Sequence, residues 1–416
     1  MTTQTTTDAD RRSARPAESP ARTGGLLPLL ALANTSMFAL YMGVGSVLMP
    51  VQIAQIDPAH KVATLGMIGG VSAVFATVFN PVAGALSDRT GRRGPWILGG
   101  GLAALAVMLL LGSVHTVLLV TIGWCLGQAA MNIYQSAVTA VVPDRIPPAR
   151  RGTASAVVGL GLPIGGTLGV VIASQTVTGL RTGYLVLGAV VALAAVLLTA
   201  LGREPRRTPT PAAPLSRQLK AFMSALASHD FRWAFIGRAL MVLGYFLVVS
   251  YQLYILTDHV TLPAGLEPTA AIAVLTPVSM AAMAVSTVVG GVLSDRWNRR
   301  KLFVGLSAAL AGLVMVVPVV SPTWTGMLVF SALNGLAFGC FMAVDTAVVT
   351  LVLPRAEDAA RDMGVLNIAS AGPQIVAPFV AATVIGHLGG YTGLFLVGGA
   401  LSLLGALAIV PIRSVR

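Results

Sequence analysis

Apolar residues along this 416-residue chain gather into long runs that short polar connections separate. An α-helix rises 1.5 Å per residue, so about 20 apolar residues cross a hydrocarbon layer of about 30 Å. Each run of this length predicts a membrane-spanning helix, because unpaired backbone is costly against lipid. Twelve such runs lie near residues 27–52, 63–86, 95–114, 117–142, 153–175, 183–201, 233–256, 270–293, 302–320, 325–353, 363–386 and 391–412.

The composition agrees with this pattern, since 55% of the residues are hydrophobic and 10% are charged. These are values typical of a membrane protein. The net charge of +12 does not indicate nucleic-acid binding, because the basic residues are not gathered on one segment. Cys125 and Cys340 lie singly inside apolar runs, which indicates neither a metal site nor a disulfide. We therefore expect a protein of the lipid bilayer without metal or cofactor.

The positions of the basic residues predict the orientation. Lys61 and Arg181 fall in odd-numbered connections and Arg238 lies inside a run, whereas the other Lys and Arg residues occupy the tails and the even-numbered connections. Positively charged short loops stay on the cytoplasmic side, so both termini are expected in the cytoplasm of a multi-pass cell-membrane protein. The short outer connections exclude a receptor ectodomain or an extracellular enzyme, and no cleaved signal peptide is expected.

The same pattern divides the chain into segments. Residues 1–25 are polar and predict a disordered cytoplasmic tail. Residues 202–231 contain the Pro-rich stretch TPTPAAP and then Leu215, Leu219, Phe222 and Leu226 at helical spacing, which indicates a cytoplasmic linker with an interfacial helix. This linker separates two six-helix halves, residues 26–201 and 232–416.

A ten-residue motif repeats about half the chain length apart. GALSDRTGRR runs from Gly84 to Arg93, and GVLSDRWNRR runs from Gly291 to Arg300. Each copy ends an apolar run and crosses a loop that turns on a residue tolerant of a left-handed conformation, Gly91 or Asn298. The repeat resembles the loops after the second and eighth helices of the major facilitator superfamily. That resemblance implies an all-α membrane protein of 12 transmembrane helices in two pseudo-symmetric halves, a transporter that acts as a monomer by alternating access.

In that family the repeated loop takes part in gating. The resemblance carries this role to the acids and arginines of both copies, which are Asp88, Arg89, Arg92, Arg93, Asp295, Arg296, Arg299 and Arg300. By pseudo-symmetry, Asp88 is expected to face the helix that opens near Met363, and Asp295 the helix that opens near Thr153, when the cytoplasmic side is closed.

Polar side chains inside the runs are costly in lipid and point to function or to helix packing. They recur at helical spacing in the first, fourth, seventh, tenth and eleventh runs, and the resemblance places the first, fourth, seventh and tenth helices around a central cavity. The candidate substrate-binding residues are Asn34, Tyr41, Gln128, Asn132, Gln135, Tyr245, Gln252, Asn334, Asn367 and Gln374.

Asp345 is the one acid, among 15 Asp and Glu residues, that lies well inside a run. A carboxyl in this position is a candidate proton carrier. Arg238 lies at a similar expected depth and is the candidate partner, although a side chain of this length also snorkels to the interface.

The fifth run contains Gly161, Gly165 and Gly169 on one helix face, which predicts close approach of a neighbouring helix. The stretch GLGLPIGG there also resembles the antiporter motif of drug exporters, but it has Leu162-Pro163 in place of the Gly-Pro pair.

Two further stretches, 343–378 and 79–96, resemble the sucrose–proton symporter branch and the related glycoside–cation symporters. This resemblance implies proton-coupled uptake of a small polar solute such as a sugar or glycoside. A proton-antiport exporter of drugs or metabolites and a non-transporting solute sensor stay open as alternatives. An enzyme is not expected, because no nucleophile–base pair or metal cluster stands inside the runs.

Overall fold

A computed structural model of the chain describes residues 25–147, 150–202, 228–352 and 359–413. The expected tail at 1–25, apart from Gly25, and residues 203–227 of the linker with its interfacial helix lie outside these ranges. Within them the chain is helical, and twelve helices are long and apolar enough to cross a membrane. The expectation of a twelve-helix, all-α membrane fold is confirmed.

The first half contains α1 and its continuations and ends with α8. Its elements are α1 (Leu26–Gly43), η2 (Val44–Leu48), α2 (Met49–Ile56), α3 (Lys61–Thr90), α4 (Gly94–Leu111), α5 (Val117–Arg145), α6 (Arg151–Gly159), α7 (Gly161–Gln175), η4 (Val177–Gly179) and α8 (Leu180–Leu201). The second half contains α10 (His229–Val249), α11 (Gln252–Asp258), α12 (Pro268–Trp297), α13 (Arg300–Val314), α14 (Val317–Val320), α15 (Trp324–Val352), α16 (Ala359–His387) and α17 (Gly390–Ala408).

Several runs that read as single helices are interrupted. The seventh run breaks at Ser250 and Tyr251, between α10 and α11. The first run contains the π-helical turn η2, one turn before Pro50. Proline lacks the N–H that would bond back along an α-helix, and this explains a widened turn at that place. These interruptions re-aim the side chains on either side of them.

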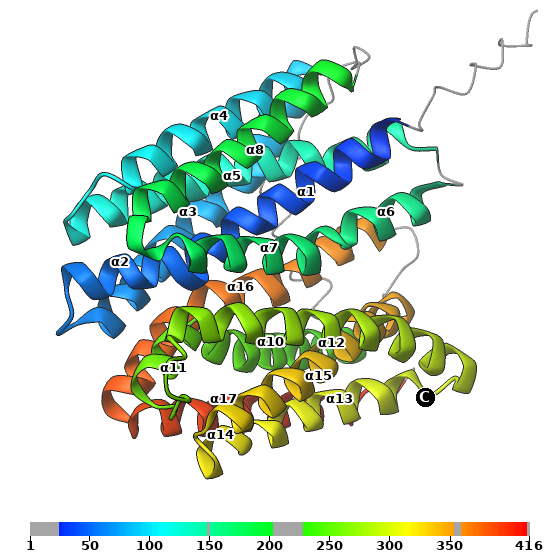
Figure 1. Cartoon of the computed structure of the whole chain (residues 1–416). Coiled ribbons are helices and arrows are strands. Elements are labelled where there is room, and N and C mark those ends of the chain that lie inside the picture. Colours follow the sequence, from blue (N-terminus) through cyan, green and yellow to red (C-terminus); the bar gives the residue numbers. More distant parts are fainter. Residues whose placement is uncertain (1–24, 148–149, 203–227, 353–358, 414–416) are drawn as a thin grey trace, which may run out of the picture.

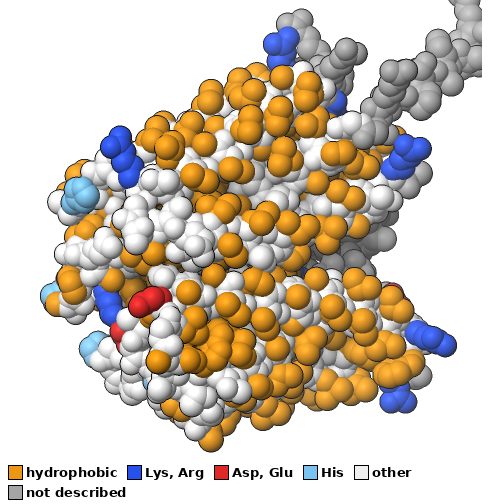
Figure 2. All heavy atoms as spheres, in the orientation of Figure 1, with side chains coloured by type: hydrophobic (Ala, Val, Ile, Leu, Met, Phe, Trp, Pro, Cys, Tyr) orange, Lys and Arg blue, Asp and Glu red, His pale blue; other side chains and the backbone are white. Residues whose placement is uncertain are grey.

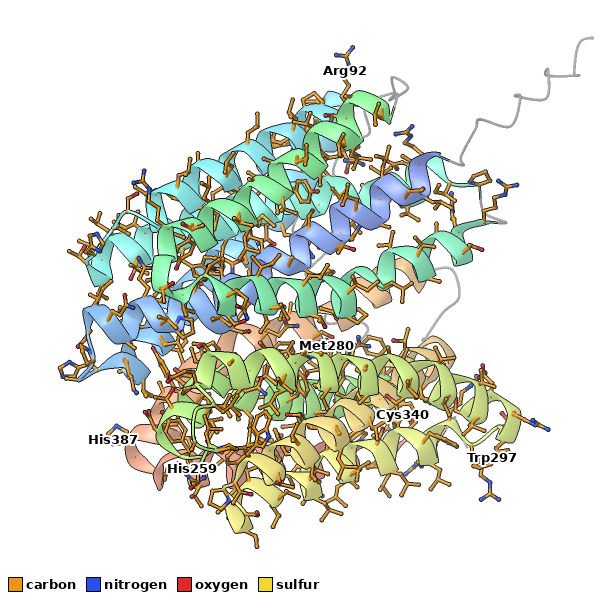
Figure 3. The ribbon with its side chains drawn as sticks, in the orientation of Figure 1. Arg92, His259, Met280, Trp297, Cys340 and His387 are labelled. Carbon is orange, nitrogen blue, oxygen red and sulfur yellow. The ribbon has the colours of Figure 1, made fainter. Side chains whose placement is uncertain are left out.

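The two halves lie one above the other in Figure 1, with α1–α8 in the upper group and α10–α17 in the lower group. We call the bundle end that carries the connections 91–93 and 298–299 the motif face. The other end, with the connections 57–60 and 259–267, is the far face. Figure 3 shows Arg92 and Trp297 at the motif face and His259 and His387 at the far face.

Apolar side chains cover the visible flank of the bundle, whereas the visible charged side chains lie towards its two ends (Figure 2). Val74, Val288 and Leu313 are among the large apolar side chains that are more than half exposed. A flank of this kind would be unusual in water and fits contact with lipid tails.

The repeated motif ends two helices in the same way. Gly91 follows α3 with φ of 63°, and Asn298 follows α12 with φ of 51°. The expected left-handed turns are therefore confirmed at both copies. The helices extend further than the sequence predicted, to Thr90 and Trp297, so the Ser-Asp-Arg residues stand in the last helical turn and not in a loop. A left-handed residue ends a helix and lets the preceding turn stay helical.

The glycines of the fifth run lie against α1. A Cβ added at Gly165 would be 2.2 Å from the carbonyl oxygen of Thr35, and one added at Gly169 would be 2.0 Å from that of Ala39. No side chain fits in either place. These two glycines bring the backbones of α1 and α7 together, which is the packing role expected from their spacing.

Candidate functional site

An ion pair lies inside the second half. The guanidinium Nη1 of Arg238, on α10, donates to Oδ2 of Asp345, on α15, at 2.9 Å. The side chains are 11% and 4% exposed, so solvent screens their interaction little. The structure thus brings together the two residues that the sequence singled out for proton coupling.

A third helix completes this group. Nε of Arg238 donates to Oγ of Ser370, on α16, at 2.7 Å. The arginine therefore joins α10, α15 and α16, and its direction is fixed by two bonds. Ser370 was not among the sequence candidates, because a single serine in an apolar helix carries no signal without its partner.

Polar side chains of the first half meet in a second group. Nδ2 of Asn132, on α5, lies 3.5 Å from the hydroxyl of Tyr41, on α1, and that hydroxyl lies 3.5 Å from Oε1 of Gln135. Asn132 also donates to the backbone oxygen of Gln128 at 2.8 Å. Four of the candidate substrate-binding residues are therefore neighbours in space.

Asn80 belongs to this group and was missed by the sequence reasoning. It lies on α3, and its Nδ2 donates to Oδ1 of Asn132 at 3.1 Å. An Asn inside an apolar run is the same signal that selected the other candidates. The search for polar residues at helical spacing passed over it because its own helix contains no second Asn, Gln or Tyr.

A pocket of about 470 Å³, including the part that opens to solvent, lies between the two halves. Three candidate substrate-binding residues of the second half share its wall, and Figure 3 shows Met280 between the halves. The ring of Tyr245 stacks on that of Phe338, with centroids 3.8 Å apart. The lining residues are Met42, Ser46, Val170, Tyr245, Val248, Val249, Gln252, Thr276, Ser279, Met280, Phe330, Ser331 and Asn334.

The remaining candidates do not join these groups. Nδ2 of Asn34 donates to the carbonyl of Leu30 on its own helix, and its side chain packs at Gly161 of α7. Gln374 is exposed and donates to the carbonyl of Ser370, also on its own helix. Asn367 lies on α16, and its side chain is outside the described part.

The acids of the repeated motif each bind an arginine of the same half. Asp88 accepts from Arg93, whose Nε also donates to Asp144 of α5 at 3.1 Å. Asp295 accepts from Nη2 of Arg300 at 2.7 Å. Arg89, Arg92, Arg296 and Arg299 are exposed.

Asp88 and Asp295 are themselves 42% and 61% exposed, and each faces its own loop in this structure. The helix opening expected opposite Asp88 lies next to residues outside the described ranges. The contacts proposed across the halves for a closed motif face are a different arrangement from this one.

Hydrogen bonds join the two halves near the far face. The hydroxyl of Tyr251 donates to the carbonyl of Val62 at 3.0 Å, and that of Tyr254 donates to the carbonyl of Pro50 at 2.9 Å. Both tyrosines are buried, so their hydroxyls hold the two halves together at this place.

An ion pair adds to this contact. Nζ of Lys61 lies 2.7 Å from Oδ1 of Asp258, and Oδ2 of the same carboxylate accepts from the hydroxyl of Tyr391 at 2.8 Å. Below it α3 and α16 touch closely, since a Cβ at Gly70 would lie 1.6 Å from the ring of Phe379. The far face is therefore held closed across the halves.

The comparisons with known proteins agree with this architecture. Residues 30–279 and 264–415 match the model of the family described as the Major Facilitator Superfamily. The MFS transporter asaE of Aspergillus flavus is 23% identical over 358 residues, which cover 85% of this chain and 78% of that protein.

Solved structures share the fold at lower identity. A bacterial homologue of the human lysosomal transporter Spinster, in an inward-facing and unoccupied conformation, matches with a TM-score of 0.72 at 15% identity and covers 95% of each chain. A POT family transporter in complex with 5-aminolevulinic acid matches with a TM-score of 0.75 at 12% identity, over 92% of this chain and 95% of that one. These similarities concern the fold.

Proposed function

This chain belongs to the Major Facilitator Superfamily and is a membrane transporter of that type, and we propose that it takes up a small polar solute, such as a sugar or glycoside, together with a proton. The solute would bind between the halves, at the pocket and the polar group around Asn132. Both termini would lie in the cytoplasm of a cell-membrane protein that works as a monomer. The narrower assignment to the sucrose–proton and glycoside–cation symporter branch is part of this proposal.

The buried Arg238–Asp345 pair is the observation that carries the proposal. A carboxylate and a guanidinium in a dry interior are costly unless they stay paired, so such groups are rare inside membrane helices without a role in transport. Protonation of Asp345 would remove its charge, weaken its bond to Arg238 and so change the contacts that join α10, α15 and α16. The position of the pair therefore supports a link between a proton and helix movement.

The repeated loops supply the proposed gate. In this structure Asp88 and Asp295 are partly exposed and bind arginines of their own halves. In the alternate state, with the motif face closed, each would turn to the N-terminus of a helix in the other half, where backbone N–H groups favour an anion. The Asp88→Asn variant should slow transport and leave folded protein in the membrane.

Proteoliposomes with an imposed pH gradient test the function directly. Radiolabelled sugars and glycosides would be offered beside a panel of lipophilic cations. Accumulation of a neutral solute that a protonophore abolishes supports uptake with a proton. Extrusion of a cation driven by an inward proton gradient would favour the exporter, and binding without movement of any solute would favour the sensor.

A further inference from the structure

Two buried polar atoms without a partner belong to residues that line the pocket between the halves. Oγ of Ser331 and Oδ1 of Asn334 make no hydrogen bond within the described part of the chain. Their residues are 2% and 3% exposed, and both line the pocket. They stand three residues apart on α15, so they present their side chains on one face of that helix.

Other buried serines of the bundle are satisfied differently. Oγ of Ser307 donates to the carbonyl of Val304 at 3.0 Å, and Oγ of Ser402 donates to that of Gly398 at 3.0 Å. A helical serine normally bonds back to its own helix in this way. A buried polar group without a partner is costly, so a position that keeps one is a candidate for binding another molecule.

The surrounding wall limits what that molecule is. The lining residues carry no formal charge, and Met42, Met280 and Phe330 give the wall an apolar side. No basic side chain stands in this lining to neutralise an anion, and no carboxylate stands there to neutralise a cation. An ether or ester has no donor for Oδ1 of Asn334, whereas a hydroxyl can donate to it and exchange a bond with Ser331.

We propose that Ser331 and Asn334 form a subsite for the hydroxyl groups of an uncharged amphipathic solute, whose apolar part lies against the methionines and Phe330. An alkyl or aryl glycoside has this chemistry, and a fully polar free sugar would leave the apolar side unused. The inference rests on the proposed function, because it assumes that the pocket holds the transported solute.

The first test needs no solute. Removing an unsatisfied group should stabilise the empty protein, so Ser331→Ala and Asn334→Leu should each raise the melting temperature in lipid nanodiscs by about 2 °C. Ser307→Ala, which removes a satisfied hydroxyl outside the pocket, should not raise it. A fall in melting temperature for both pocket variants would mean that a bound water or a protein group satisfies these atoms, and the subsite would be rejected.

The second test uses phenyl β-D-glucopyranoside and its fully O-methylated derivative, which keeps the ring and loses every donor. The parent should bind the wild type in nanodiscs, and the methylated compound should bind at least tenfold more weakly. Ser331→Ala and Asn334→Leu should each lower the affinity for phenyl β-D-glucopyranoside by about five- to a hundredfold. The control Ser307→Ala should bind this compound as the wild type does. Equal binding of the two compounds, or binding of neither, would overturn the assigned class.

These measurements use no proton gradient and so separate the two proposals. Binding that depends on Ser331 and Asn334, without proton-driven uptake in vesicles, would leave the subsite standing and reject proton coupling. The opposite result would be proton-driven uptake of a solute that binds the wild type and both pocket variants with the same affinity. It would support proton coupling and reject the subsite.

Discussion

Replacing Asp345 by Asn tests the proposed coupling with the smallest change of shape. Asparagine keeps an oxygen that can accept from Arg238 at the present 2.9 Å, but it carries no charge and binds no proton. If Asp345 is the proton carrier, the variant behaves like a permanently protonated transporter. It should bind solute and reorient with it, and it should fail to use a proton gradient.

The size of the effect follows from the burial of the pair. At 2.9 Å and an effective dielectric constant of about 20, two unit charges attract by about 6 kcal/mol before desolvation is counted. Removing one partner of a buried pair lowers the free energy of unfolding by about 3–5 kcal/mol. We expect a loss at the lower end of this range, because asparagine keeps one hydrogen bond to Arg238. Replacing Arg238 by Gln as well should recover much of that loss, since no unpaired charge then stays buried.

The second expected magnitude is the solute gradient that the transporter can maintain. Moving one charge across about 100 mV is worth about 2.3 kcal/mol, which corresponds to a solute gradient of about fiftyfold for one proton per solute. Vesicles with the wild-type protein should approach that ratio under such a potential. Those with Asp345→Asn should stay near equal concentrations, and labelled solute should still exchange with unlabelled solute across the membrane.

The matched control is Asp230→Asn, at the start of α10, where the carboxylate accepts the backbone N–H of Arg413. It should accumulate solute as the wild type does. Accumulation by Asp345→Asn that a protonophore abolishes would refute the reasoning. Asp345 would then be a structural partner of Arg238, and the proton path would run elsewhere.

Three further predictions follow from single contacts. Asp258→Asn removes the ion pair to Lys61, whose side chains are 29% and 20% exposed, so we expect the closed far face to lose about 0.2–1 kcal/mol of stability. In a protein whose native cysteines are replaced, a cysteine introduced at the far face should then be labelled up to about fivefold faster. Unchanged labelling would mean that this ion pair does not hold the far face closed. Asn80→Leu should weaken solute affinity about ten- to a hundredfold if its group binds solute, and unchanged affinity would identify it as helix packing. Gly169→Ala should lower the melting temperature by several degrees because its Cβ has no room, whereas Gly159→Ala, with open space around it, should not.

Patterns along the chain predict the elements and the symmetry. Run length decided the twelve helices, since a bilayer of fixed thickness demands a fixed number of apolar residues and satisfies backbone groups only in helices. The repeat decided the two left-handed turns at Gly91 and Asn298, because few residues adopt that conformation. The isolated charges at positions 238 and 345 marked a candidate site, because an ion in an apolar run is costly wherever the helix lies.

Which of these residues meet depends on how the helices pack. Helical spacing indicates which side chains lie on the same face of a helix, but not which helix packs against that face. Asn80 and Ser370 could therefore be recognised only from their hydrogen bonds to residues on other helices. Asn34 shows the converse, since the neighbour of its side chain is Gly161 of α7, which the spacing along α1 does not indicate. Tyr251 lies at the break in the seventh run and Tyr254 just after it, and their hydroxyls bond to the other half, which the local sequence does not indicate.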